Sequence, residues 1–212
     1  MMKKRAFLIN VISLWIFSGC TVLSFYPLYT EKELIKNDQL IGKWESIDGD
    51  TIMWEISFED SIWLKKMNNP FDKGSKEIPN KFTYTLSLYQ KGAADNAKAK
   101  FYVHLVKLGD RTYFDFYPEE WEMNNTILTF HLMPVHTFAK VEIIDNAIKI
   151  QWFDSDWLQE LFFNNKVRIR HENNGANTLL TAKPEELQKF ILKYGEDKNA
   201  LNDDMEYILK RI

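Results

Sequence analysis

Hydrophobic and polar residues alternate along most of the chain after its first forty residues. Short runs rich in aromatic and β-branched residues, separated by turn residues, are typical of β-strands. The pattern predicts strands at 41–48, 51–58, 82–90, 98–107, 111–117, 127–133, 135–144, 147–153 and 166–171, with a further short one at 178–181. The polar segment 65–81 predicts a loop.

Two hairpins can be placed in register from the alternation alone. Their tight turns are predicted at 109–110 and 145–146. In the first hairpin, His104 then faces Asp115 on the polar side of the sheet. The apolar side holds the pairs Leu105–Phe114 and Val103–Phe116, and in the second hairpin Val141–Ile150 and Ala139–Trp152. Such period-two alternation indicates a sheet with one buried and one solvated face.

Helical periodicity is found at 154–164, 183–194 and 203–212. Asp154 or Ser155 can cap the first helix, and Pro184 suits the first turn of the second. The sequence therefore predicts a mainly β fold. We expect an antiparallel barrel of about eight to nine strands with two or three amphipathic helices packed outside, because closure removes exposed strand edges.

The first twenty residues have the organisation of a secretory signal peptide. Met1 to Arg5 is basic, residues 6–17 are mostly apolar, and small residues precede Cys20, which is the only cysteine. The apolar run is too short to span a bilayer as a helix, which needs about 20 residues. Residues 17–20 resemble the lipobox of bacterial lipoproteins, although Phe17 stands where that motif prefers Leu. The alternative is an uncleaved membrane anchor with an incidental cysteine.

The resemblance to lipoproteins implies that residues 1–19 are removed and that the Cys20 thiol carries acyl chains such as palmitate. More than one chain gives stable anchoring in a membrane. Residue 21 is Thr rather than Asp. By the sorting rule of some Gram-negative lipoproteins, this implies the inner leaflet of the outer membrane, with the protein facing the periplasm.

Composition limits the partners. The chain has 27 basic and 30 acidic residues and a net charge of −3, which argues against nucleic acid. With its one thiol used for lipid, the chain has no internal disulfide, so its stability must come from core packing. We expect residues 20–38 to be a lipidated tether, apolar enough to dock in part on the protein. Residues 39–212 are then a single β-rich domain.

Gly42-Lys43-Trp44 opens the first long strand and resembles the G-x-W motif that begins lipocalin-like (calycin) barrels. The resemblance implies that Trp44 closes the barrel base and that Gly42 lets the chain bend into the strand. It also implies a basic residue near the base, for which Arg168 or Arg170 is a candidate. Three segments, HLVKLGDRTYFDFYP, HLMPVHTF and LTAKPEELQKFILKY, resemble an uncharacterised group of bacterial lipoproteins with no known activity. The helix at 154–164 departs from simple lipocalins.

One polar cluster is a candidate for chemistry. His104, His131 and His136 lie in the strand-rich middle of the chain together with Asp115. Histidine with carboxylate is the composition of a metal site or an acid–base pair. The spacing is not diagnostic, and a cross-strand hydrogen-bonded pair His104–Asp115 explains it as well. The chain has no catalytic motif, and we expect no enzyme activity, no metal and no cofactor.

Three functions remain open on the sequence alone. The first is a binding module whose barrel holds a small apolar or amphipathic molecule. The second is a structural or assembly lipoprotein that binds another envelope protein through a surface patch. The third is a lipid carrier with an open half-barrel. The many aromatic residues, 15% of the chain, can line a cavity or fill a solid core.

Overall fold

A computed structural model describes residues 21–49, 51–65, 75–92, 98–119, 126–129, 131–175 and 177–212. The predicted signal peptide and Cys20 lie outside the described residues. Within the described ranges, no helix is both long enough and apolar enough to cross a membrane.

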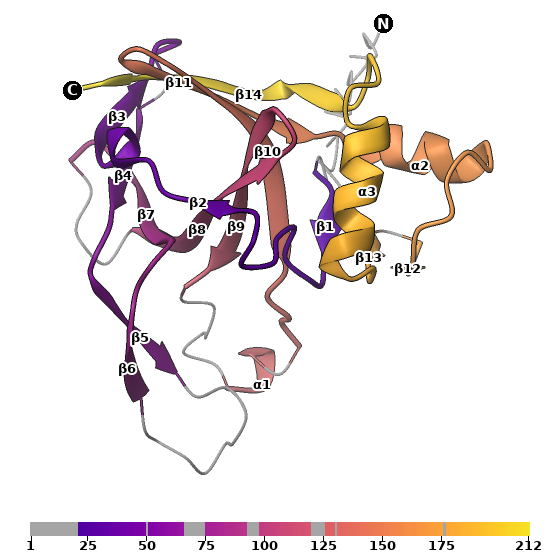
Figure 1. Cartoon of the computed structure of the whole chain (residues 1–212), viewed down its shortest axis with the longest axis horizontal. Coiled ribbons are helices and arrows are strands. Elements are labelled where there is room, and N and C mark those ends of the chain that lie inside the picture. The colour runs from indigo at the N-terminus through magenta and orange to yellow at the C-terminus, as the bar shows by residue number, and fades with distance from the viewer. Residues whose placement is uncertain are drawn as a thin grey trace, which may run out of the picture.

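The described strands close into an eight-stranded antiparallel barrel (Figure 1). In spatial order they are β3 (Gly42–Ser46), β4 (Ile52–Ser57), β7 (Thr83–Gln90), β8 (Ala99–Leu108), β9 (Arg111–Pro118), β10 (His136–Ile144), β11 (Ala147–Phe153) and β14 (Leu201–Arg211). The last strand, β14, pairs with β11 on one side and β3 on the other, which closes the sheet. The predicted fold class is confirmed, and an open half-barrel does not fit this closure.

Both hairpin registers are confirmed. In the β8–β9 hairpin, His104 pairs with Asp115 and Leu105 pairs with Phe114. In the β10–β11 hairpin, Val141 pairs with Ile150. Leu105, Phe114 and Val141 belong to the buried cluster inside the barrel, as the alternation predicts.

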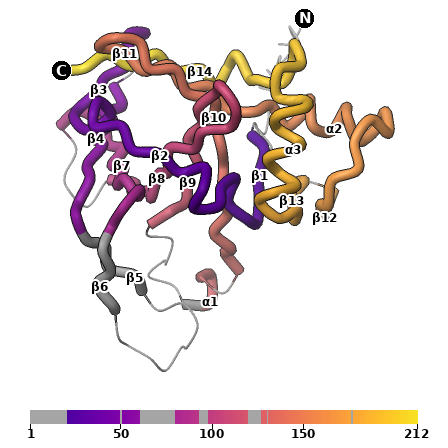
Figure 2. Tube along the Cα trace, viewed as in Figure 1, coloured from indigo at the N-terminus to yellow at the C-terminus, as the bar shows by residue number. Residues whose placement is uncertain are grey.

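The segment before the barrel is part of the fold. Strand β1 (Leu23–Ser24) pairs with the start of β10 and, in parallel, with β13 (Thr178–Leu180), which in turn pairs with β12 (His171–Asn173). Strand β2 (Leu34–Ile35) pairs with β8. Figure 2 shows this segment passing in front of β8 and β9 on its way to β3. Val22 and Leu28 are buried, which agrees with the expectation that apolar residues of the segment dock on the protein.

The helices lie outside the barrel. They are α1 (Thr126–Thr129), α2 (Ser155–Phe163) and α3 (Pro184–Tyr194), with a short 3-10 helix, η1 (Asp38–Leu40), before β3. The Asp154 carboxylate accepts hydrogen bonds from the backbone N–H groups of Asp156 and Trp157, so it caps α2 as predicted. Apolar faces of α2 and α3 pack on the outer face of the barrel through a second cluster of buried side chains. That cluster includes Phe138, Phe153, Trp157, Leu158, Leu161, Leu187, Phe190 and Ile191.

Four sequence predictions of elements are wrong. Residues 203–212 belong to strand β14 rather than a helix. Met205 and Leu209 fit an apolar spacing of four as well as an alternation of two, and pairing with β3 and β11 decides for the strand. The predicted loop 65–81 contains β6 (Ser75–Pro79), which pairs with β5 (Ser61–Lys65) in a separate hairpin. The predicted strand 127–133 is partly helix α1, and residues 166–170 form no strand, with β12 beginning at His171. In these last two cases, local β propensity is not matched by a neighbouring strand to pair with.

Candidate functional site

The up-and-down order of the strands gives the barrel two distinct ends. At the first end β3 begins at Gly42 and β14 finishes at Arg211. We call this the sealed end. At the second end β9 finishes at Pro118 and β11 finishes at Phe153. We call this the aromatic end. The interior side chains nearest to it are Ile52, Leu88, Phe101, Phe116, Trp152 and Met205. Trp54 and Tyr207 lie deeper in the interior.

Trp44 and Arg211 close the sealed end. The Trp44 side chain is 1% exposed, and its indole Nε1 donates a hydrogen bond to the Leu40 carbonyl at 2.9 Å. The Arg211 guanidinium lies over the Trp44 ring, 4.3 Å from its centroid. Its Nη1 donates to the Ile41 carbonyl at 2.8 Å, and its Nη2 donates to the Gln39 carbonyl. A cation over an aromatic face and donors on backbone carbonyls hold the last strand to the chain that enters the first.

Gly42 is required by this arrangement. Its φ of 147° is in the region that side-chain-bearing residues rarely adopt, and a Cβ here would lie 2.5 Å from Arg211 Nη1. The role that the lipocalin resemblance gives to Gly42 and Trp44 therefore fits the geometry. The basic residue at the base is Arg211 rather than Arg168 or Arg170, because Arg170 is paired with Glu186 of α3 at 2.9 Å. Nothing in the local sequence around Arg211 indicates its approach to Trp44, which lies far away in the chain.

 The two residues meet only because β14 pairs with β3, which sets Arg211 opposite Trp44.

The aromatic end has a different surface. The Trp152 ring stacks on Phe116, with centroids 5.2 Å apart and an interplanar angle of 21°. Trp54 and Tyr207 complete the group, with centroids 5.6 Å from one another, and the Tyr207 centroid lies 5.8 Å from that of Trp152. The buried Trp54 Nε1 has no hydrogen-bond partner among the described residues. It is a donor that a ligand oxygen could satisfy.

Exposure separates the two ends. Trp152 is 8% and Phe116 is 5% exposed, whereas Trp44 is 1% exposed and Leu209 is fully buried. Four other interior side chains at the aromatic end are apolar and half-buried, namely Ile52, Leu88, Phe101 and Met205. Trp44 under Arg211 thus closes the sealed end, although Ile41, Phe58 and Ile143 near it are half-buried. The other end is bordered by aromatic and aliphatic side chains of low to intermediate exposure. Such a border suits an apolar molecule.

The predicted polar cluster forms on the outer face of the barrel. His136 Nδ1 lies 2.7 Å from Asp115 Oδ1, and the backbone N–H of Leu28 donates to Asp115 Oδ2 at 2.7 Å. Asp115 is fully buried. Burial raises the pKa of this carboxyl, while the hydrogen bonds from His136 and Leu28 act in the opposite direction. The carboxylate therefore fastens the segment before the barrel to β9 and β10.

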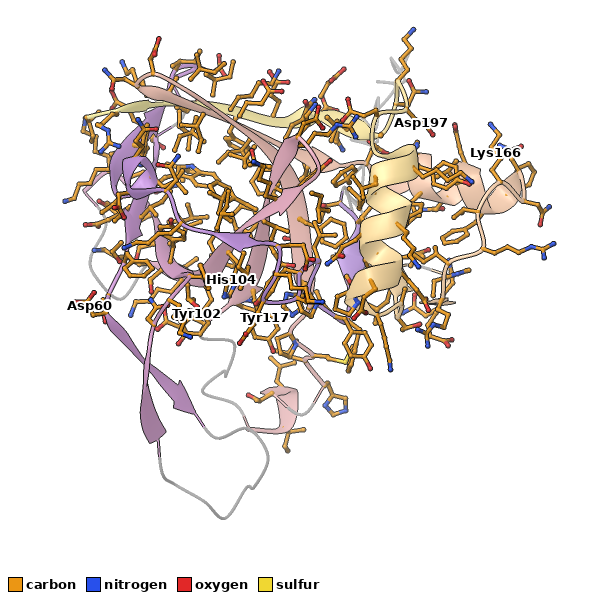
Figure 3. All side chains as sticks on the ribbon, in the orientation of Figure 1. Asp60, Tyr102, His104, Tyr117, Lys166 and Asp197 are labelled. Carbon is orange, nitrogen blue, oxygen red and sulfur yellow. The ribbon has the colours of Figure 1, made fainter. Side chains whose placement is uncertain are left out.

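His104 joins the same cluster through Thr83 and Tyr29. Its Nε2 lies 3.0 Å from Thr83 Oγ1 and 3.3 Å from the Tyr29 hydroxyl, and its ring packs against Tyr29. Burial and, to a smaller extent, the charge of His136 lower the pKa of His104 to about 4. Figure 3 shows Tyr102, His104 and Tyr117 gathered on β8 and β9. A neutral His104 at physiological pH is suited to packing and hydrogen bonding.

The structure therefore brings together His104, Asp115 and His136. His131 has its own contact, with Nδ1 2.8 Å from the Ile127 carbonyl beside α1. Within the described ranges, no group of three or more His, Cys, Asp or Glu side chains could hold a metal ion. Tyr29 and Thr83 were not predicted as members of the cluster, because no local pattern relates the segment before the barrel to the outer face of β8.

No family model matches the chain, and neither a curated protein nor a solved structure matches it. The function is therefore argued from the geometry of the barrel itself.

Proposed function

We propose that the protein is a lipid-anchored binding protein of the bacterial envelope, whose barrel binds a small apolar or amphipathic molecule at the aromatic end. The observation that carries the proposal is the contrast between the two barrel ends. Trp152 and Phe116, which are 8% and 5% exposed, border one end, whereas Trp44 under Arg211 closes the other. Acyl chains on Cys20 supply the anchor, at the periplasmic face of the outer membrane.

The chemistry of the aromatic end favours a ligand with an apolar body. Aromatic side chains offer a large apolar area and flat faces for packing. The Trp54 N–H, which has no partner in the described part of the chain, favours a ligand that also carries a hydrogen-bond acceptor, such as a carboxylate or ester oxygen. An amphipathic molecule such as a fatty acid has both features.

The polar cluster does not take part in this proposal. Asp115 and its partners lie on the outer face of β9 and β10, while the aromatic side chains face the interior. The cluster holds the N-terminal segment in place through Leu28 and Tyr29. Its role in the proposal is structural.

The ligand proposal is tested by titrating the full chain with cis-parinaric acid and following tryptophan fluorescence. Met205→Gln changes a half-buried interior side chain at the aromatic end, and Ile143→Gln makes the same kind of change near the sealed end. We expect saturable binding that Met205→Gln weakens by about tenfold, the effect of losing one apolar contact, and that Ile143→Gln leaves unchanged. Absence of saturable binding, or equal effects of the two substitutions, contradicts the proposal.

The anchor is tested by mass spectrometry of the protein extracted from bacterial membranes. We expect a chain that begins at Cys20 and carries acyl groups, and a Cys20→Ser variant that is not acylated. An intact N-terminus with an unmodified thiol would contradict the proposed anchor.

A further inference from the structure

The chain leaves its proposed anchor at the aromatic end of the barrel. Thr21 bridges to Asp154, and the Val22 backbone N–H donates to the carbonyl of Phe153 at 3.3 Å. Phe153 is the last residue of β11 and belongs to the aromatic end. Successive Cα atoms are about 3.8 Å apart, so a lipid on Cys20 is attached one residue from this fixed point.

Exposed apolar side chains lie beyond the same end. Strand β1 runs antiparallel to β10, with Ser24 opposite His136. Phe25 and Tyr26 form the bend that follows Ser24, and Leu132 and Met133 lie in the chain shortly before His136. Their exposed fractions are 45% for Phe25, 37% for Tyr26, 37% for Leu132 and 53% for Met133. We call these four residues the apolar rim.

Other exposed apolar residues lie at both the aromatic end and the sealed end. Ile47 is 51% exposed in the connection between β3 and β4, and Ile127 is 72% exposed in the connection between β9 and β10. Both connections are at the aromatic end. At the sealed end, Ile144 and Ile212 are each 59% exposed at a hairpin turn and at the last residue, and Leu192 of α3, beside Gly109, is 46% exposed. They serve as controls for the rim.

Charge indicates how the rim would meet a membrane. The whole sequence carries a net charge of −3, and removal of residues 1–19 with Lys3, Lys4 and Arg5 makes it −6, so general attraction to anionic lipid is not expected. Burial of apolar side chains in the interface between headgroups and acyl chains does not require such attraction. The contact is therefore expected on zwitterionic lipid.

From these observations we infer that the aromatic end faces the bilayer, with the apolar rim in its interface and the sealed end pointing away. The inference rests on the proposed acyl anchor at Cys20. It deepens the proposed function, since a barrel held in this way receives its ligand directly from the membrane. The ligand class is then a membrane-dissolved molecule with an acyl chain.

The orientation is tested on the full acylated chain in phosphatidylcholine vesicles. Met133→Cys and Ile144→Cys place an environment-sensitive fluorophore at two similarly exposed positions at opposite ends. Doxyl-labelled lipid then reports the depth of each fluorophore. We expect quenching at position 133 to exceed that at position 144 by at least about twofold, because interfacial side chains lie about 5–10 Å deep. The Cys20 thiol carries lipid in this protein, so the fluorophore reacts only with the introduced cysteine.

Equal quenching at both positions, or stronger quenching at position 144, overturns the inference. Phe25→Cys and Ile212→Cys form a second pair, so that the test does not depend on one variant folding well. Uptake of cis-parinaric acid in vesicle-free solution separates the two proposals. Uptake without a quenching contrast contradicts the orientation alone, and a quenching contrast without uptake contradicts the ligand function alone.

Discussion

The two ends of this barrel are built from similar residues and differ in what those residues contact. Trp44 at the sealed end donates to a backbone carbonyl and lies under a guanidinium. Trp152 at the aromatic end contacts other rings and retains some exposure. The comparison teaches that an aromatic-rich sequence does not by itself indicate a ligand site. The polar partners of each ring decide whether it closes the structure or borders an accessible surface.

The N-terminal segment connects the two ends. It is fixed near Phe153 at the aromatic end, is fastened to Asp115 midway, and reaches Leu40 beneath Trp44. Gln188 of α3 also donates to the Leu28 carbonyl at 3.1 Å, which links the segment to the outer helices. The segment is thus a structural element as well as the path to the proposed anchor.

The largest expected effect is on stability at the sealed end. Trp44→Ala removes a fully buried ring and should cost about 3–5 kcal/mol of unfolding free energy. Trp152→Ala should cost less, because that side chain is not fully buried and its site can relax towards solvent. Urea unfolding of both variants measures the difference. A greater loss for Trp152→Ala would contradict the assignment of the two ends.

The next largest effect is on how the free energy of unfolding depends on pH. It acts through His104, which contacts Tyr29 of the N-terminal segment that connects the two ends. Because the pKa of His104 falls from 6.5 to about 4 on folding, the unfolded chain binds more protons between these values. Stability contributed by neutral His104 is therefore lost as the pH falls through this window, by about 3 kcal/mol at most. Asp115, whose pKa is raised, acts with the opposite sign.

His104→Gln isolates this contribution. We expect its unfolding free energy to change less between pH 6.5 and pH 4 than that of the unmodified chain, measured by urea unfolding at each pH. Identical pH profiles for the two proteins would show that His104 is not held neutral by its burial.

A smaller effect distinguishes Gly42, the first residue of β3, from Gly49, which lies in the connection after β3. Gly42 and Gly49 both have positive φ, of 147° and 80°, but only Gly42 has a neighbour within 4 Å of an added Cβ. Gly42→Ala should cost about 1–3 kcal/mol, and more than Gly49→Ala, since strain and the displacement of Arg211 act together. Thermal unfolding of the two variants provides the measurement. A cost for Gly49→Ala equal to that for Gly42→Ala would argue against the closure by Arg211.

Local pattern predicted much of the barrel, and distant pairing explains what it missed. The alternation around His104 and Asp115 fixed one hairpin register because both strands and their turn are contiguous in sequence. Strand β14 was predicted as a helix because its closure partners, β3 and β11, lie far away in the chain. Arg211 over Trp44 could not be predicted for the same reason.

In the candidate site too, contacts within one hairpin were predictable and contacts between distant segments were not. The pairing of His104 opposite Asp115 was predictable, whereas the contact of Asp115 with His136 depends on where β10 lies beside β9. The exposure contrast between Trp44 and Trp152 was not predictable, because both residues have the same place in an alternating strand pattern.

The indole N–H signals in a proton–nitrogen correlation spectrum test the central claim most directly. The full chain is titrated with cis-parinaric acid while the signals of Trp44, Trp54 and Trp152 are followed. The account predicts that the Trp54 and Trp152 signals shift in a saturable manner, while the Trp44 signal, bonded to the Leu40 carbonyl, stays in place. A shift confined to Trp44, or no shift in any of the three, would contradict the division of the barrel into a sealed end and a binding end.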